Sequence, residues 1–250
     1  MACNNFYTPL EQFEISILRP LTIFGLDFSF TNSALYLALT AATLLFVYSF
    51  GIYEATLVPS RWQSVVEMVY KFVLDMIKQQ AGNKGLQYFP FLFLIFNFIL
   101  FSNLLGLLPF GFTTTGHLII TFTLAFSINL GLVFIGFMHH GIKFLKLFVP
   151  SDAPVFLLPL IVVIEVVSYC LRTFSLSIRL FANMMAGHTL LHILCSFIVA
   201  FLQSSIPFLG LLPFVLVLAV IGLELGIAFL QAYVFTILVC IYLNDSLNLH

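Results

Sequence analysis

The chain has 250 residues, of which 62% are hydrophobic and only 8% are charged, and its mean hydropathy is +1.14. A soluble domain has about 25% charged residues, so this composition excludes an ordinary soluble protein and predicts an all-α membrane protein. The net charge is −1 and the nine Lys and Arg form no basic stripe. We therefore expect no nucleic-acid partner.

Apolar runs predict five membrane-embedded helices in a single membrane domain, residues 1–250. Spans of about 20 residues, the length that crosses a bilayer, lie at 33–53, 89–110 and 117–138. Two longer runs follow at 155–202 and 207–243. At about 1.5 Å per residue the first of these would reach about 70 Å, roughly twice an upright span. It is either a broken two-span hairpin or a steeply tilted helix, and the lack of a strong turn cluster favours two long tilted helices.

An amphipathic helix is predicted at 60–80, between the first two spans. Apolar residues from Trp62 onward recur at helical spacing on one side, and Glu67, Lys71 and Asp75 repeat every four residues on the other. The pattern fits a helix lying on the membrane surface. A helix docked on other parts of the protein would have the same pattern.

The positions of the basic residues predict the orientation. One connection, after the first span, contains Arg61, Lys71, Lys78 and Lys84. Lys143 and Lys146 follow the third span, which places them on the same side, whereas the opposite side has only Arg19. The positive-inside rule then puts the N-terminus outside and the C-terminus inside.

Ionisable residues at membrane depth are candidates for function, because each costs a few kcal/mol or more there. The set comprises Glu165, Arg172, Arg179, His188, His192 and Glu224. The first three are spaced by seven residues and share one helix face, with Asn183 near it. His188 follows Arg179 by nine residues, which places it on the opposite side and about 13 Å along the axis.

Two kinds of chemistry are therefore predicted on opposite sides of one helix. Arg179 supplies a cation that cannot lose its proton, and no acid lies three or four residues from it. His188 and His192 are neighbours whose imidazoles exchange protons near neutral pH. In the last segment Glu224 and Gln231 are seven residues apart and share a face. The arrangement suits directed proton movement.

Structural interpretations remain open for several of these residues. Arg172 could pair with Glu165 in a purely structural ion pair. His188 and His192 could be core histidines or, less readily, a metal site with two ligands.

Polar residues near the span ends also have two interpretations, and no motif for a cofactor is found. Asn97 and Asn103 could line a polar path or bond across helices, and His139 and His140 are expected in a solvated loop. The sequence contains no Gly-rich nucleotide-binding loop and no CxxC or Cys/His metal-ligand spacing. We expect no nucleotide, cofactor or metal.

Five stretches resemble subunit a of the F-type ATP synthase over nearly the whole chain. They are "PLEQFEI", "LFVPSDAP", "SYCLRTFSLSIRLFANMMAGH", "LELGIAFLQAYVFTILVCIYLND" and "LNLH". The resemblance is to the mitochondrial form of plants and algae, with alphaproteobacterial relatives close. It implies an amphipathic helix on the matrix surface, a helical hairpin at 89–110 and 117–138, and two long tilted helices against a ring of c subunits.

The resemblance also implies roles and partners. Arg179 would face the rotor, and the proton path would include Glu224, His188, His192 and Gln231, supported by Asn183, Asn103 and Glu165. The chain would provide two offset half-channels in the mitochondrial inner membrane, with its N-terminus in the intermembrane space and its C-terminus in the matrix. Its partners would be the c ring, the peripheral stalk, other membrane subunits and lipid. It would be no enzyme on its own.

Two other classes of membrane protein would use similar buried charges. A proton-coupled secondary transporter usually has two related halves, and no internal repeat is evident here. A haem-bearing respiratory subunit needs axial ligands on facing helices, whereas His188 and His192 are neighbours on one helix.

Overall fold

The structure is a computed structural model. It describes residues 13–20, 22–23, 26–27, 29–53, 56–108, 111–141, 144, 158–203 and 210–247. Lys143 and Lys146, used above to predict orientation, lie outside the described residues, as do the first residues of the predicted segments 155–202 and 207–243.

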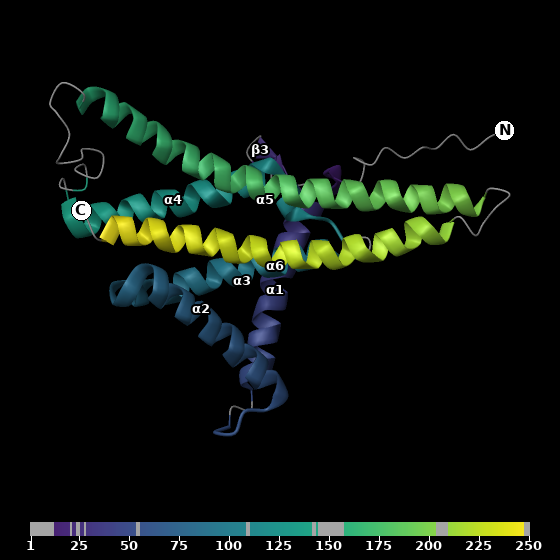
Figure 1. Ribbon diagram of the computed structural model, residues 1–250, viewed down its shortest axis with the longest axis horizontal. Coiled ribbons are helices and arrows are strands. Elements are labelled where there is room, and N and C mark those ends of the chain that lie inside the picture. The colour runs from purple at the N-terminus through teal and green to yellow at the C-terminus, as the bar shows by residue number, and fades with distance from the viewer. Residues whose placement is uncertain are drawn as a thin grey trace.

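Six α-helices make up almost all of the described chain (Figure 1), which is an all-α membrane protein. The first is α1, Asn32–Ile52, capped by the Thr31 hydroxyl, which accepts a hydrogen bond from the Ala34 amide at 3.4 Å. The two segments of the predicted hairpin are α3, Phe89–Gly106, and α4, Leu118–His140, and both pack against α6. Two short 3-10 helices flank α3, η2 at Leu86–Tyr88 and η3 at Thr114–Gly116. Among the residues that the structure describes, five helical stretches are long and apolar enough to cross a membrane, and one of them joins α2 and α3.

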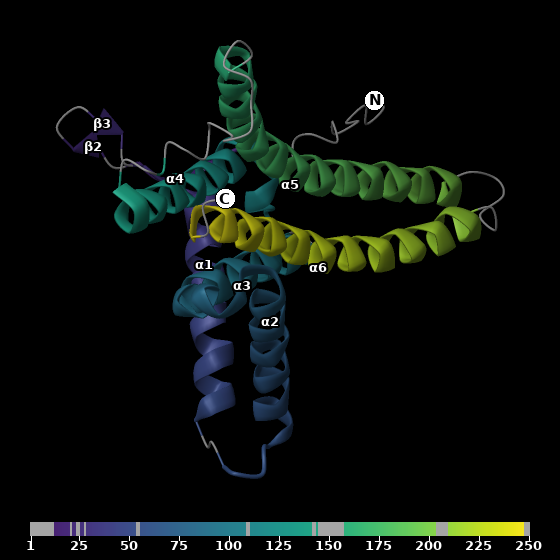
Figure 2. The ribbon, with the colours of Figure 1, turned by 60° about the vertical axis from the view of Figure 1, so that its left-hand side comes forward.

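The two long helices are α5, Leu158–Leu202, and α6, Leu211–Leu247. At about 1.5 Å per residue they exceed the roughly 30 Å thickness of a bilayer core. They run side by side over the C-terminal part of α5 and the N-terminal part of α6, and both cross the direction of α1 (Figures 1 and 2). Figure 2 also shows that α5 bends along its length. Within the described part of the chain, each apolar segment is therefore one long helix and no two-span hairpin.

The amphipathic helix α2, Arg61–Gly85, lies partly on protein. Val73 and Ile77 are fully buried in the core, and the Phe72 ring lies 5.7 Å from that of Tyr233 of α6. Trp62, near the start of the helix, is 65% exposed. The later turns therefore dock on α6, as the second interpretation expects, and the apolar side chains of the first turns stay exposed.

The core lies where α2, α3, α4, the middle of α5 and the C-terminal half of α6 meet. Its largest fully buried side chains include Phe96 of α3, Leu132 of α4 and Phe235 of α6. In the N-terminal region the structure has four short strands that the sequence did not predict: β1 at Ile17–Arg19, β2 at Thr22–Ile23, β3 at Leu26–Asp27 and β4 at Phe30–Thr31. β1 pairs antiparallel with β4, and β2 with β3.

Candidate functional site

The guanidinium of Arg179 projects from the middle of α5 with an exposed side chain. No hydrogen bond or ion pair joins it to any other described residue. Since a guanidinium stays protonated, α5 presents a permanent cation on the outer surface of the chain. Among the described residues, no carboxylate compensates this charge.

Four residues after Arg179, Asn183 connects α5 to α6. Its Nδ2 donates a hydrogen bond to Oε1 of Gln231 at 2.9 Å. Gln231 is only 4% exposed, and its own Nε2 has no partner among the described residues. The side-chain amide of Gln231 is thus held by α5 through its oxygen, while its nitrogen has a buried N–H donor without a described acceptor. A water or a proton-carrying group could bind to this donor.

Glu224 lies two turns before Gln231 on α6 and faces α5. It is 6% exposed, and neither carboxylate oxygen has a partner among the described residues. A Cβ added to Gly187 of α5 would collide with its Oε1, so the missing side chain of Gly187 makes room for the carboxylate. A buried carboxyl without a hydrogen-bond partner is costly, and such a group is a candidate for proton exchange.

A cavity of about 850 Å³ joins Glu224 to the two histidines of α5. His188, His192 and Cys195 line it from α5, and the α3–α4 connection closes another side. Its other lining residues are Asn32, Tyr36, Leu107, Leu108, Gly111, Phe112, Leu191, Val217 and Ile221. The cavity is large enough for many waters. Three proton-exchanging side chains predicted from the sequence therefore share one space.

No metal centre is formed by the described residues, in which no three His, Cys, Asp or Glu side chains are grouped as ligands. His188 has its Nε2 buried without a partner, and its ring meets Phe13 edge-on at 6.5 Å. His188 and His192 are both half-buried. Both histidines lie in the wall of a cavity whose other lining residues are mostly apolar.

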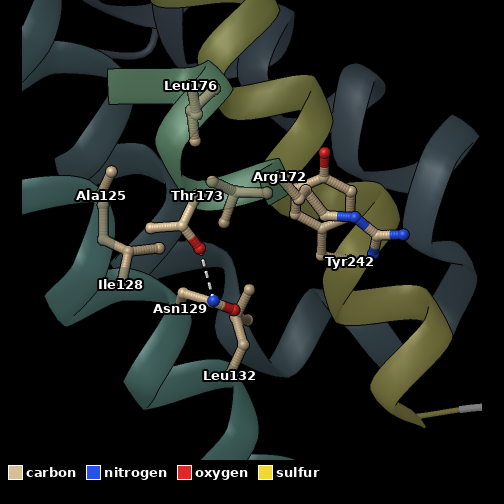
Figure 3. A pocket seen from close by; sticks show the side chains of 9 residues that line it. Ala125, Ile128, Asn129, Leu132, Arg172, Thr173, Leu176 and Tyr242 are labelled. Carbon is tan, nitrogen blue, oxygen red and sulfur yellow. Dashed lines mark hydrogen bonds between the residues drawn. The ribbon is translucent and has the colours of Figure 1, made fainter. Parts of the chain in front are cut away.

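Arg172 has a different partner from the one expected. Its Nη1 lies 3.8 Å from Oδ2 of Asp245 on α6, and its guanidinium carbon lies 4.2 Å from the centre of the Tyr242 ring. The prediction of a pair with Glu165 is wrong, because the crossing of α5 and α6 brings an acid from the other helix closer. Figure 3 shows Arg172 lying along the Tyr242 ring beside a small cavity between α4, α5 and α6.

Two other predicted polar residues lie away from the large cavity. Glu165 is half-buried near the start of α5 and forms no ion pair in the described part of the chain. Asn103 is fully buried in α3, where its Oδ1 accepts a hydrogen bond from the Thr115 hydroxyl at 2.9 Å. Asn97 bonds across helices, since its Oδ1 accepts from the Tyr48 hydroxyl at 2.6 Å.

The loop expected at His139 and His140 is wrong, since these residues form the last turn of α4, where His139 is exposed and His140 is half-buried. The Nε2 of His139 lies 2.9 Å from the Tyr88 hydroxyl, and that of His140 lies 3.2 Å from the Leu247 carbonyl oxygen. Both contacts tie this end of α4 to neighbouring elements.

A seam of buried hydroxyl and amide groups was missed by the sequence analysis. Three pairs join α4 and its preceding turn to α3 and α5: Ser102 with Thr114 at 2.8 Å, Thr121 with Ser177 at 3.3 Å, and Asn129 with Thr173 at 2.6 Å (Figure 3 shows the last). The run Thr113–Thr114–Thr115 was the available signal. Small polar side chains pair across closely packed membrane helices in this way.

His117 was also missed. It precedes α4, its ring stacks on Phe112 of the cavity wall at 5.1 Å, and its Nε2 is buried without a partner in the described structure. Burial lowers the pKa of the His117 imidazole below its ordinary value, since it disfavours the charged form. Phe13 lies edge-on to both His117 and His188, so a single aromatic ring separates two imidazoles.

Comparison with known proteins identifies the family. Residues 34–244 match the family model described as ATP synthase A chain. The chain is 49% identical over 256 residues to ATP synthase subunit a of Marchantia polymorpha, covering 100% of both chains. It is 48% identical over 245 residues to that of Chondrus crispus (97% of each chain) and 48% identical over 243 residues to that of Pelagibacter ubique (97% of this chain, 98% of the relative). This chain therefore belongs to the ATP synthase subunit a family.

Proposed function

We propose that this chain is the proton-translocating stator subunit of an F-type ATP synthase, with two offset half-channels that serve a carboxylate on each subunit of a rotor ring. The observation that carries the proposal is the unpaired, exposed Arg179 on the same helix as the cavity-lining histidines. Its partners would be the c ring, the peripheral stalk, the other membrane subunits and lipid.

The large cavity would be the entrance half-channel. A proton from outside would reach His188, His192 and Glu224 in water, and pass by way of Asn183 and Gln231 to the rotor carboxylate. The carboxyl of Glu224 suits this step because neither of its oxygens is hydrogen-bonded to a described residue. Once protonated, the rotor group is neutral and can turn into lipid, where a charge would cost several kcal/mol.

Arg179 would separate the two half-channels. Its positive field favours loss of the proton from a carboxyl that arrives at the second half-channel. It has no lone pair that can accept a proton, so protons cannot hop through it from one half-channel to the other. Every proton is thereby forced to travel with the rotor. Each charge that crosses 100 mV supplies about 2.3 kcal/mol, so several protons are needed for each ATP.

Asn103 and Glu165 would act as polar supports. Asn103 would do so through the α3–α4 turn, since its side chain bonds to Thr115. Glu165 stands on α5 two turns before Arg172, on the side of the second half-channel. The chain contains no nucleotide-binding loop, so it would move protons and leave ATP chemistry to other subunits.

The proposed location is the mitochondrial inner membrane, with the N-terminus in the intermembrane space and the C-terminus in the matrix. The orientation rests on the basic residues of the two connections after α1 and α4 and on the positive-inside rule. The organelle rests on the sequence motifs shared with plant and algal mitochondrial forms. A multi-pass bacterial membrane protein of the same family, such as the Pelagibacter relative, would use the same mechanism.

The test is Arg179→Ala in the whole ATP synthase, reconstituted in liposomes. We expect ATP synthesis driven by a proton gradient and ATP-driven proton pumping to fall by more than about tenfold, at least about 1.4 kcal/mol in activation free energy. Arg179→Lys should also work poorly, because a desolvated ammonium can lose its proton. Arg61→Ala, which removes an exposed cation at the start of α2, is the matched control. Coupled synthesis retained in Arg179→Ala would reject the proposal.

A further inference from the structure

Two arginines lie on one face of α5, and only one of them has an acidic partner among the described residues. Arg172 is held by α6, with Asp245 at 3.8 Å and the ring of Tyr242 at 4.2 Å, and Tyr169 adds a second ring at 5.6 Å. Arg179 has no hydrogen bond or ion pair to any described residue and is exposed. One of the two charges is therefore compensated within the chain, and the other is open.

The spacing of the two arginines puts both within reach of one moving partner. They are seven residues apart, about two turns, so their Cα atoms are about 10 Å apart along α5 and on the same side. The Tyr242 hydroxyl lies in the electrostatic field of both. The side chain of Arg172 is still 26% exposed, so its charge is not hidden by burial alone.

The direction of the helices makes this separation matter. The paired parts of α5 and α6 run across the direction of α1, as both ribbon views show (Figures 1 and 2). In an upright helix, two turns would shift a residue by a third of the bilayer thickness. In a helix whose axis is close to the membrane plane, two turns shift a residue mainly within that plane. The shift then follows the path of a neighbour that moves in the membrane plane. A carboxylate on that path would meet both arginines.

We propose that Asp245 and Tyr242 mask the charge of Arg172, so that only one of the two arginines attracts the rotor carboxylate. The inference rests on the proposed function and adds to it a role for two residues of α6. A guanidinium cannot lose its proton, so the charge of Arg172 can be compensated only by a nearby group, here one on α6. Without the mask Arg172 would hold the carboxylate two turns from Arg179 and delay its passage. Asp245 and Tyr242 are thus positioning residues that act through Arg172.

An ion pair of this kind is worth little in water but more at membrane depth. Exposed pairs in water contribute little to stability, because water screens both charges. Arg172 and Asp245 keep 26% and 42% of their side-chain surface exposed. The face of the Tyr242 ring adds a cation–π contact to the ion pair. From α6, the carboxylate of Asp245 contacts the edge of the guanidinium at Nη1, and the Tyr242 ring covers one of its faces.

The experiment measures ATP-driven proton pumping by the whole ATP synthase in liposomes, normalised to the amount of assembled complex. We expect Asp245→Asn to slow pumping several-fold, and Arg172→Gln/Asp245→Asn to restore most of the lost rate, because the double variant has no charge left to mask. Asp75→Asn, which removes an exposed acid from α2, is the control and should pump normally. A purely structural tie between α5 and α6 would predict no recovery in the double variant, and that result would overturn the proposal.

A second pair of variants decides the question if Asp245→Asn does not assemble. Tyr242→Leu weakens the mask without removing an acid, and we expect it to slow pumping when Arg172 is present but not in the Arg172→Gln background. Equal slowing in both backgrounds would contradict the proposal. Failure of the masking role leaves the wild-type rate and the Arg179→Ala defect unchanged, whereas failure of the proposed function removes the Arg179→Ala defect itself.

Discussion

At the scale of single residues, a substitution of Glu224 is the simplest test of the proposed proton path. Its carboxyl lies in the wall of the large cavity with neither oxygen bonded to a described residue. We expect Glu224→Gln to lower proton flux through the reconstituted complex by about tenfold or more, because the amide keeps the shape but cannot exchange a proton. Glu67→Gln on α2, whose carboxylate accepts from Gln63 at 2.9 Å, is the matched control. Normal flux in Glu224→Gln would remove this residue from the path.

Gly187 offers a second test at this scale that leaves every titratable group in place. A Cβ there would collide with Oε1 of Glu224, with its Cδ only 3.0 Å away, so Gly187→Ala should displace the carboxylate and reduce flux several-fold. Shortening the acid with Glu224→Asp in the same chain should recover part of the loss. Gly131→Ala on α4 is the control, since nothing lies within 4 Å of a Cβ there. A Gly187→Ala variant with unchanged flux would mean that the position of the carboxylate is not important.

Residue spacing predicted some of this site but not all of it. The seven-residue intervals correctly put Glu224 and Gln231 on one face of α6, since a helix repeats nearly every two turns. The same rule led to Glu165 as the partner of Arg172, which is wrong. The true partner, Asp245, is 73 residues away in sequence, so its pairing depends on how α5 crosses α6. Spacing within one helix contains no information on that crossing.

At the scale of elements, the Asn183–Gln231 hydrogen bond is a direct tie between α5 and α6. Hydrogen bonds between membrane helices contribute about 0.6 kcal/mol on average. We expect Asn183→Leu and Gln231→Leu each to lower the unfolding temperature of the detergent-solubilised complex. The two effects should be less than additive in the double variant, because both remove the same bond.

The control for this cycle is Ser196→Ala on α5. The Ser196 hydroxyl donates to the Ile193 carbonyl of its own helix at 2.7 Å, so its loss should leave the α5–α6 contact unchanged. Strictly additive effects of Asn183→Leu and Gln231→Leu would show that the bond does not contribute to stability.

The helices were the predictable elements, and the short connections were not. The helix predicted at 33–53 is found at Asn32–Ile52, and the one at 117–138 is found at Leu118–His140. Long apolar runs set these bounds because a bilayer core requires them. The strands β1 to β4 have only two or three residues each, too few for an alternating pattern to be visible. The hydroxyl seam was missed for a related reason, since each of its pairs joins two elements.

At the scale of the whole molecule, the cavity should be open to water from one side of the membrane. Cys195 lines it and is exposed, whereas Cys240 is fully buried. We expect silver ions or a charged thiol reagent added from the outer side to modify Cys195 and to block proton flux. Cys195→Ser should keep its flux and resist the reagent. Blocking from the opposite side only would reverse the proposed orientation, and no reaction from either side would mean that the cavity is dry.

One consequence of the fold concerns how a partner could slide past α6. At Gly222 and Gly226, near Glu224, an added Cβ would meet no atom of the described chain within 4 Å. Helices usually lock together because the side-chain ridges of one enter the grooves of the other. A patch without side chains has no ridges to enter the grooves of a neighbouring helix. That helix could therefore move past α6 with a low energy barrier. The same lack of interlocking side chains gives little attraction between the two helices. The interactions that hold them together must come from charges or from other subunits.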